Sequence, residues 1–209
     1  MKKFLIAVMV MIMVVSLFST NVLAASFYSG VNRSGNFTGI SASIKAPSSY
    51  PVIGTSGESC WITTQAETPS GRTWVQTGLR YWDGFTVMKT YFEYKYPPTG
   101  DYDLIHIGTH LKGATVAYKL QYNSSNVVWD AYIGGSKIGS YNNARTYANV
   151  QAQGESHDKT QVQLGPFVFS DVKMRLNGSS SYTNNTTKAP TANAPYTFTV
   201  HNNYYKYTV

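Results

Sequence analysis

Charged residues and cysteine are both scarce in this sequence. Asp, Glu, Lys and Arg make up 13% of the 209 residues, and Cys60 is the only cysteine. A single cysteine excludes an intramolecular disulfide and argues against a thiolate metal site. Lys and Arg are scattered without a run of three, so the net charge of +7 does not indicate a nucleic-acid-binding protein. Strong helix formers are few, whereas Thr, Ser, Asn, Gly and the 17 tyrosines are prominent, which is typical of an all-β protein.

A long apolar run occurs only at the start of the chain. Lys2 and Lys3 precede residues 4–18, which are apolar except for Ser16, and Ala24 stands where a signal peptidase would read. No later window holds 18 consecutive apolar residues, so we expect no membrane-embedded segment in the mature protein. We expect residues 1–24 to be a signal peptide and residues 25–209 to form one domain. The mature protein is then secreted, held at most loosely at the cell envelope, and its composition fits a bacterial protein.

Apolar and polar residues alternate with period two along most of the remaining chain, as in strands. The pattern predicts strands at residues 39–46, 61–65, 74–82, 87–96, 103–108, 115–122, 127–133, 147–153 and 167–176, and a terminal hairpin from 196–200 and 204–209. Short strands separated by Gly and Pro turns predict an antiparallel β-sandwich of jelly-roll type. Residues 177–195, rich in Asn, Ser, Thr and Pro, are predicted to be a flexible surface loop.

Several residue types that often carry chemistry lack a convincing arrangement here. His106 and His110 are four residues apart on a strand-like segment, and no third metal ligand is near them in sequence. Residues 156–158 contain Ser, His and Asp, but consecutive residues cannot point into one another as a catalytic triad. Glu93 and Glu155 both lie in strand-like segments among aromatic residues, which leaves the two-carboxylate chemistry of a glycosidase open.

Three segments in order carry the most specific signal. They are Ser-Cys-Trp-Ile at 59–62, Trp-Val-Gln-Thr-Gly at 74–78, and Tyr-Phe-Glu-Tyr-Lys-Tyr-Pro at 91–97. This set resembles the glutamic peptidases (eqolisins), whose pattern has a Trp strand, then Gln-Thr-Gly, then Glu between aromatic residues with Tyr-Pro close behind. The resemblance extends over roughly residues 59–209 and includes the Gly-Pro-Phe-Val-Phe strand at 165–169.

The resemblance implies a concanavalin A-like sandwich with a groove on its concave sheet. Gln76 matches the family glutamine, whose amide donates a hydrogen bond to the oxyanion of the reaction. Glu93 matches a glutamate beside the groove, and the resemblance implies a substrate-contacting or supporting role for it. The residues that we expect to bind substrate on these grounds are Trp61, Trp74, Trp82, Glu93, Tyr94 and Gln151.

The catalytic glutamate can be aligned in two ways on residues 149–155. One register places Gln151 at the catalytic position, and because an amide cannot act as a base, that register predicts an inactive relative. The other register uses Gly154-Glu155, which resembles the Gly-Gly-Glu of the neprosin branch of glutamic peptidases. Residues 151, 153 and 155 share one face of a strand, so both registers direct Glu155 to the same sheet surface as Gln151.

We therefore predict a peptide-bond hydrolase in which Gln76 and Glu155 form the catalytic dyad. Its substrate is a protein or peptide, it needs no metal or other cofactor, and we expect a monomer. The same aromatic groove also suits stacking on sugars, so a non-catalytic module that binds cell-wall or host glycan is the alternative. A third hypothesis is a surface or matrix protein that assembles through its tyrosine-rich strands.

Overall fold

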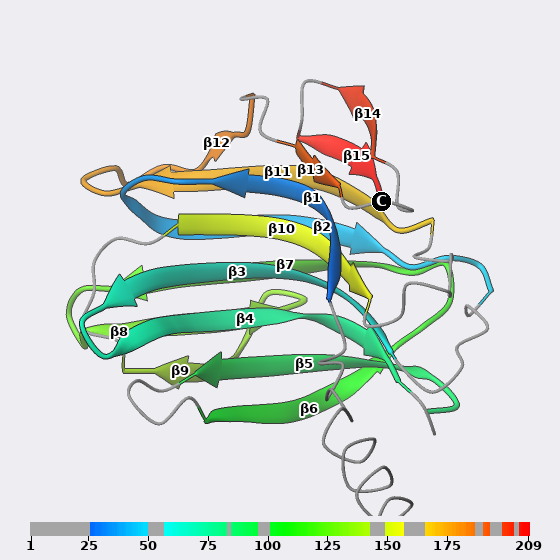
Figure 1. Ribbon diagram of the computed structural model, residues 1–209, viewed down its shortest axis with the longest axis horizontal. Coiled ribbons are helices and arrows are strands. Elements are labelled where there is room, and N and C mark those ends of the chain that lie inside the picture. Colours follow the sequence, from blue (N-terminus) through cyan, green and yellow to red (C-terminus); the bar gives the residue numbers. More distant parts are fainter. Residues whose placement is uncertain are drawn as a thin grey trace, which may run out of the picture.

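The computed structural model describes residues 26–49, 57–82, 85–95, 101–142, 149–156, 166–186, 190–192, 198–202 and 205–209. Within these residues the chain is built from antiparallel strands in two sheets, with no helix. This confirms the predicted all-β, concanavalin-like sandwich of jelly-roll type (Figure 1). The predicted signal peptide, residues 1–24, lies outside the described residues, and among the described residues no helix is long and apolar enough to cross a membrane.

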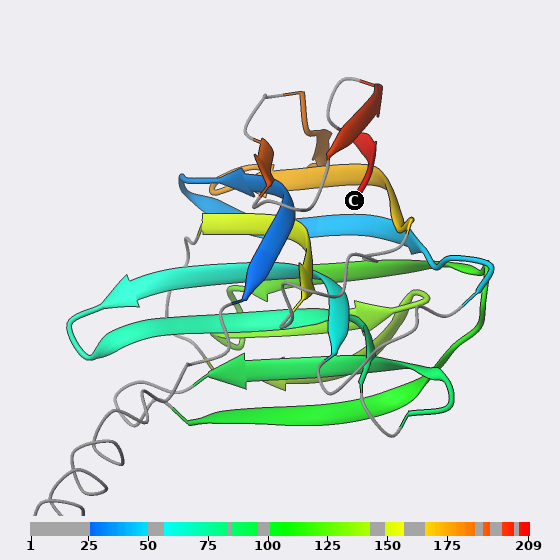
Figure 2. The ribbon, with the colours of Figure 1, turned by 45° about the vertical axis from the view of Figure 1, so that its right-hand side comes forward.

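The sheet that carries the site, here called sheet A, has seven strands. Their spatial order is β13 (Pro190–Ala192), β1 (Phe27–Arg33), β10 (Asn149–Ser156), β3 (Glu58–Thr68), β4 (Gly71–Tyr81), β5 (Met88–Lys95) and β6 (Tyr102–His110). The second sheet, sheet B, contains β14 (Thr199–Asn202), β15 (Lys206–Thr208), β11 (Val168–Leu176), β2 (Phe37–Lys45), β7 (Thr115–Asn123), β8 (Val128–Ile133) and β9 (Ser136–Tyr141), in that order, with β12 (Thr183–Asn184) paired to β11. The two sheets lie face to face, and the terminal β14–β15 hairpin continues sheet B beyond β11 (Figure 2).

All the predicted strands are present at least in part, and four further strands are found. Every strand predicted from alternation overlaps an observed one, but β1, β9, β12 and β13 were not predicted. Two of these, β12 and β13, fall inside the stretch at 177–195 that we predicted to be a surface loop. The omission of β1 matters most for function, because that strand pairs with β10 and contributes to the site described below.

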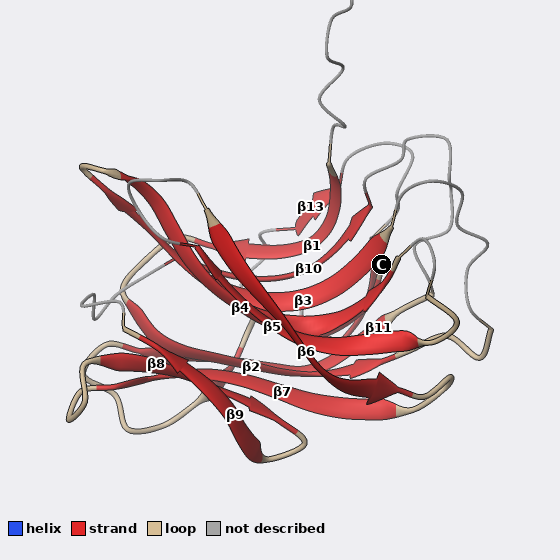
Figure 3. Cartoon of the chain, turned by 90° about the horizontal axis from the view of Figure 1, so that it is seen from below, coloured by secondary structure: helices blue, strands red, loops and turns tan. Residues whose placement is uncertain are grey.

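The core lies between the sheets and is built from alternate residues of each strand. Sheet A contributes Ile62, Val75 and Leu79, and sheet B contributes large rings such as Trp129, each of them 1% exposed or less. Burial of a side chain of this size contributes about 1.5 to 3 kcal/mol, so the inner faces hold the two sheets together. Since successive strand residues point to opposite faces, the residues between these core positions on sheet A point away from sheet B. Figure 3 shows the strands of sheet A bending away from sheet B at their ends, which makes that outer face concave.

Candidate active site

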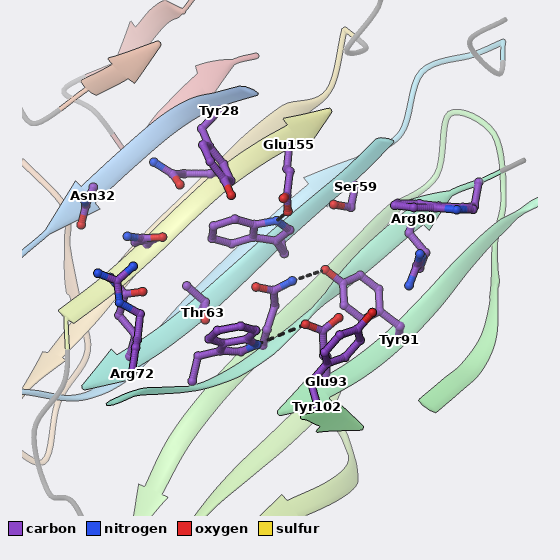
Figure 4. A pocket seen from close by; sticks show the side chains of 17 residues that line it. Tyr28, Asn32, Ser59, Thr63, Arg72, Arg80, Tyr91, Glu93, Tyr102 and Glu155 are labelled. Carbon is purple, nitrogen blue, oxygen red and sulfur yellow. Dashed lines mark hydrogen bonds between the residues drawn. The ribbon is translucent and has the colours of Figure 1, made fainter. Parts of the chain in front are cut away.

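The concave face of sheet A forms a groove with a volume of about 640 Å³. Strand alternation supplies its lining, because every second residue of β3, β4, β5 and β10 points into it. The lining residues are Tyr28, Asn32, Ser59, Trp61, Thr63, Gln65, Arg72, Trp74, Gln76, Arg80, Trp82, Tyr91, Glu93, Tyr102, Gln151, Gln153 and Glu155. Most of them are polar or aromatic, and only two are acidic (Figure 4).

Gln76 lies in the middle of a row of residues that runs across four strands. On one side it pairs with Glu93 of β5, and on the other with Thr63 of β3, which in turn pairs with Gln151 of β10. Side chains directly opposite in an antiparallel pair have Cβ atoms about 5 Å apart. Glu93 is therefore the immediate cross-strand neighbour of Gln76, while Gln151 is two strands away on the other side.

Glu155 occupies a second row, four residues from Gln151 along β10. It pairs with Tyr28 of β1 on one side and with Ser59 of β3 on the other, and Ser59 pairs in turn with Arg80. Gln76 thus lies between two carboxylates on the same face of the sheet. Glu155 comes from β10, on one side of β4, and Glu93 comes from β5, on the other side. Figure 4 shows the Glu155 and Glu93 side chains on opposite sides of the groove.

Each carboxylate is held by the indole N–H of a tryptophan on a neighbouring strand. Trp61 Nε1 donates to Glu155 Oε2 over 3.0 Å, and Trp74 Nε1 donates to Glu93 Oε1 over 3.1 Å. Hydrogen bonds to a charged acceptor are stronger than neutral ones and restrict its orientation. The two tryptophans, Trp61 on β3 and Trp74 on β4, therefore orient the carboxylates as well as forming the groove wall.

A glycine under the groove lets β3 and β4 approach closely beside Trp61. A Cβ atom on Gly78 would lie 2.1 Å from the Cys60 carbonyl oxygen and 2.7 Å from Trp61 Cα. No side chain fits at that distance, so glycine is required at this position of the groove floor. The resemblance to the Gln-Thr-Gly pattern thus extends to a residue with a clear steric role.

Tyr91 connects Gln76 to the electrostatics of the groove. Gln76 Nε2 donates a hydrogen bond of 2.6 Å to the Tyr91 hydroxyl, which is buried. Burial raises the pKa of this hydroxyl, and the charges of Glu93 and Glu155 raise it further, against smaller opposing effects of the Gln76 hydrogen bond and of Arg80. Tyr91 therefore remains a neutral hydroxyl and fixes one N–H of the Gln76 amide.

The Glu93 carboxyl is biased toward its protonated form. Burial raises its pKa, the Trp74 hydrogen bond and the Arg80 charge oppose that rise, and the charge of Glu155 adds to it. The net direction is upward. A groove carboxyl that keeps its proton above the usual range is suited to proton transfer, and such perturbed groups cluster at functional sites.

Cations stack on the aromatic walls at both ends of β4. The Arg80 guanidinium lies 4.2 Å from the centre of the Trp82 ring, and the Lys95 ammonium lies 4.7 Å from that of Trp74. Such contacts are attractive because the ring face carries negative charge. Together with Arg72 these side chains place positive charge around a groove that also holds the carboxylates of Glu93 and Glu155.

The structure brings together all but one of the residues that we predicted for the site. Gln76, Glu155, Trp61, Trp74, Trp82, Glu93 and Gln151 all line the groove. Tyr94 does not, because it follows Glu93 directly on β5 and so points to the opposite face, where its ring stacks on Tyr141 at 4.6 Å between centres.

Several lining residues were not predicted from the sequence. Arg80 and Tyr91 share a strand face with Gln76 and Glu93, so the alternation already contained the signal for both. Tyr28 and Asn32 come from β1, which was not recognised as a strand. Burial and the neighbouring Glu155 raise the pKa of Tyr28, which also hydrogen-bonds to that carboxylate.

Metal binding finds no support among the described residues. No group of three or more His, Cys, Asp or Glu side chains is placed to hold an ion there. The two histidines that we considered make other contacts: His110 is buried and hydrogen-bonds to the Tyr118 hydroxyl, and His106 packs against the Phe85 ring. Burial lowers the pKa of His110, against the opposing effect of its hydrogen bond to the Ala114 carbonyl.

Comparison with known proteins identifies the fold. No protein-family model and no curated protein matches the sequence. Among solved structures, the chain is similar to scytalido-glutamic peptidase bound to a peptide-based transition-state analogue, with a TM-score of 0.58, 16% identity, and coverage of 88% of this chain and 97% of the other. It is also similar to SCP-B, an eqolisin peptidase in complex with the tripeptide Ala-Ile-His, with a TM-score of 0.57, 13% identity, and coverage of 88% and 96%. The chain thus has the fold of the glutamic peptidases of the eqolisin family.

Proposed function

We propose that this protein hydrolyses peptide bonds in the groove of sheet A, with Gln76 and Glu155 as its catalytic dyad. The observation that carries the proposal is that Gln76 and Glu155 line the same groove, on the same face of one sheet. The shared fold with two peptidases that bind peptide ligands supports it. The leader-like residues 1–24 suggest that the substrate is a protein or peptide outside the cell.

The chemistry needs a base for water and a donor for the oxyanion. The Glu155 carboxylate takes a proton from water, and the resulting hydroxide attacks the peptide carbonyl carbon. The Gln76 amide has two N–H donors, one of which is directed at the Tyr91 hydroxyl. The other N–H is available for the developing oxyanion, and a preorganised donor of this kind contributes about 3 to 4 kcal/mol to the transition state. No metal or cofactor enters this reaction.

Two further features of the groove suit this reaction. The Trp61 N–H orients the Glu155 carboxylate, so the base is positioned before substrate arrives. The aromatic walls formed by Trp74 and Trp82 offer apolar contact to side chains of an extended peptide. We expect the protein to act as a monomer.

The proposal is tested by cleavage of an unfolded protein by the purified mature chain from pH 2 to 8, with a metal chelator present. Wild type is compared with Glu155→Gln and Gln76→Ala, and the products are read by mass spectrometry. We expect at least a 100-fold loss of rate in each variant. Asp171→Asn is the matched control, because Asp171 lies on sheet B and Asn tolerates its positive φ of 52°. Full activity in Glu155→Gln, or none in folded wild type, would contradict the proposal.

One observation favours a second function, the binding of glycan without catalysis. In the row of Gln76, β10 presents the amide of Gln151 instead of a carboxylate. If Glu155 cannot reach the reacting carbonyl, the groove still has aromatic walls and hydrogen-bonding amides, and such side chains can bind a sugar. A folded wild type that cleaves no peptide but binds oligosaccharide, with loss of binding in Trp74→Ala, would establish this function instead.

A further inference from the structure

We propose that Glu93 is a second catalytic carboxyl, the general acid that gives a proton to the leaving amine. This inference rests on the proposed peptidase function and divides its proton transfers between two residues. Glu155 activates water on one side of Gln76, and Glu93 protonates the amine on the other. The resemblance at sequence level implied only a contacting or supporting role for Glu93.

The position of Glu93 carries the inference. It is the direct cross-strand partner of Gln76, so a carbonyl whose oxygen accepts from the Gln76 amide is held beside the Glu93 carboxyl. Its side chain lines the groove, and Trp74 Nε1 holds one of its oxygens at 3.1 Å. The other oxygen is thereby left to carry a proton toward the substrate.

The electrostatics give the two carboxyls different tasks. Burial raises the pKa of Glu93, and the negative charge of Glu155 raises it further, so Glu93 keeps its proton to a higher pH than an ordinary glutamate. A pair of titratable groups in which one holds a proton and the other is ionised supplies an acid and a base at the same pH. Burial is the main cause of the raised pKa of Tyr91, and the charges of Glu93 and Glu155 both add to it, so both carboxylates act on the hydroxyl to which Gln76 donates.

The reaction balances with these two groups alone. Water loses one proton to Glu155 and forms a bond from its oxygen to the carbonyl carbon. The C–N bond then breaks as the Glu93 proton passes to the nitrogen, which leaves as an amine. The enzyme ends with Glu155 protonated and Glu93 ionised, and a proton exchange through solvent restores the starting state.

The test uses two substrates with the same acyl peptide, an ordinary amide and a p-nitrophenyl ester. The amine of an amide substrate leaves only when its nitrogen is protonated, whereas the p-nitrophenolate of the ester leaves without a proton. We expect Glu93→Gln to lower kcat for the amide by about 100-fold or more while it changes ester hydrolysis less than about tenfold. Glu155→Gln should lower both, since water attacks in both reactions, and Asp171→Asn should change neither.

The ester reaction also reports folding, because a variant that still hydrolyses it has an intact groove. Equal losses on both substrates in Glu93→Gln, or no loss on either, would overturn the role of Glu93 and leave the peptidase proposal standing. Glu93→Asp provides a second variant, in which we expect partial recovery of amide hydrolysis relative to Glu93→Gln. If wild type hydrolysed neither substrate, the proposed function itself would fail, and the inference with it.

Discussion

The outer faces of the two sheets hold their carboxylates in opposite settings. On sheet B, Asp130 accepts hydrogen bonds from Ser140 at 2.6 Å and Asn123 at 3.3 Å and pairs with Lys137 at 2.6 Å. Burial alone would raise its pKa, but these partners outweigh burial and lower it. On sheet A, Glu93 has an indole N–H for one oxygen, lies near a second carboxylate, and has a raised pKa.

This difference separates a structural carboxylate from one suited to chemistry. Asp130 is ionised and surrounded by donors, so its charge stabilises the fold and is not free to exchange a proton near neutral pH. Glu93 and Glu155 each accept an indole N–H and face a groove open to substrate. Four substitutions test this contrast, beginning with the change that should have the largest effect.

Gly78→Ala should disrupt the groove more than any other small change. The added methyl group would meet the Cys60 carbonyl and the Trp61 backbone at less than 3 Å, so β3 and β4 must separate. We expect a loss of about 2 to 3 kcal/mol in unfolding free energy and a large loss of activity as Trp61 moves away from Glu155. Urea unfolding and peptide cleavage measure the two effects. Gly108→Ala is the matched control, since the nearest atom, Thr90 Oγ1, is 3.4 Å away; equal effects of the two changes would contradict the steric explanation.

Glu58→Gln should stabilise the protein at neutral pH. This buried side chain on β3 has no hydrogen-bond partner for either carboxyl oxygen among the described residues, and burial raises its pKa from 4.5 to about 8. Ionisation of Glu58 therefore favours the unfolded chain, so the contribution of Glu58 to stability is most favourable below pH 4.5 and becomes less favourable as the pH rises toward 8. At pH 7 the cost is about 3 kcal/mol.

The measurement is urea unfolding at pH 4 and pH 7. We expect Glu58→Gln to gain about 3 kcal/mol over wild type at pH 7 and to gain nothing at pH 4. Glu67→Gln serves as control, because Glu67 is exposed and pairs with Arg72 at 2.6 Å. A gain of equal size at both pH values would show that removal of the charge is not the cause.

Asp130→Asn should lower the stability of the protein without changing its activity, unlike a substitution in the groove. The lowered pKa of Asp130 means that its charge stabilises the folded state above the unfolded pKa and that this contribution is lost in acid. We expect the variant to lose about 1 to 2 kcal/mol of stability at pH 7, with a smaller deficit near pH 2 and unchanged peptide hydrolysis. Thermal unfolding and kcat measure both. A loss of activity without a loss of stability would break the contrast between the sheets.

Trp74→Phe should produce the smallest but most specific change. The substitution keeps the aromatic wall and removes the N–H that favours ionised Glu93, so the pKa of Glu93 should rise further. If Glu93 is the acid, the alkaline limb of the rate profile moves upward by about one pH unit, since one hydrogen bond to a charge is worth about 1.5 kcal/mol. Trp82→Phe, the matched change at the other tryptophan of the wall, should leave the limb in place; a downward shift in Trp74→Phe would contradict the assignment.

The alternation of apolar and polar residues predicted the fold and much of the site, but it could not predict which strands pair or in which register. It placed Gln76 with Trp74 and Trp82, and those residues do share the groove. We did not apply alternation to Glu93 and Tyr94, which are neighbours in one motif and which we therefore predicted for the same site. Consecutive residues of a strand point to opposite faces, so only Glu93 faces the groove.

The remaining features of the site depend on contacts distant in sequence. Glu93 lies opposite Gln76 because of the register between β4 and β5. Trp61 donates a hydrogen bond to Glu155, 94 residues away in sequence, because β3 pairs with β10. No local pattern encodes either contact. The strand β1 escaped notice because Phe27–Arg33 has weak alternation and contains Gly30, yet its pairing with β10 brings Tyr28 to the groove.

The most direct test of a two-carboxylate groove is the pH dependence of kcat/KM for one peptide amide, measured from pH 2 to 9 on wild type and Glu93→Gln. We expect a bell-shaped wild-type profile. Its acid limb reflects the base, and its alkaline limb lies above the usual range of a glutamate, because Glu93 must keep its proton. In Glu93→Gln the remaining activity should be low and the alkaline limb should disappear. An alkaline limb that persists unchanged in Glu93→Gln, or a wild-type protein that cleaves nothing at any pH, would contradict the account.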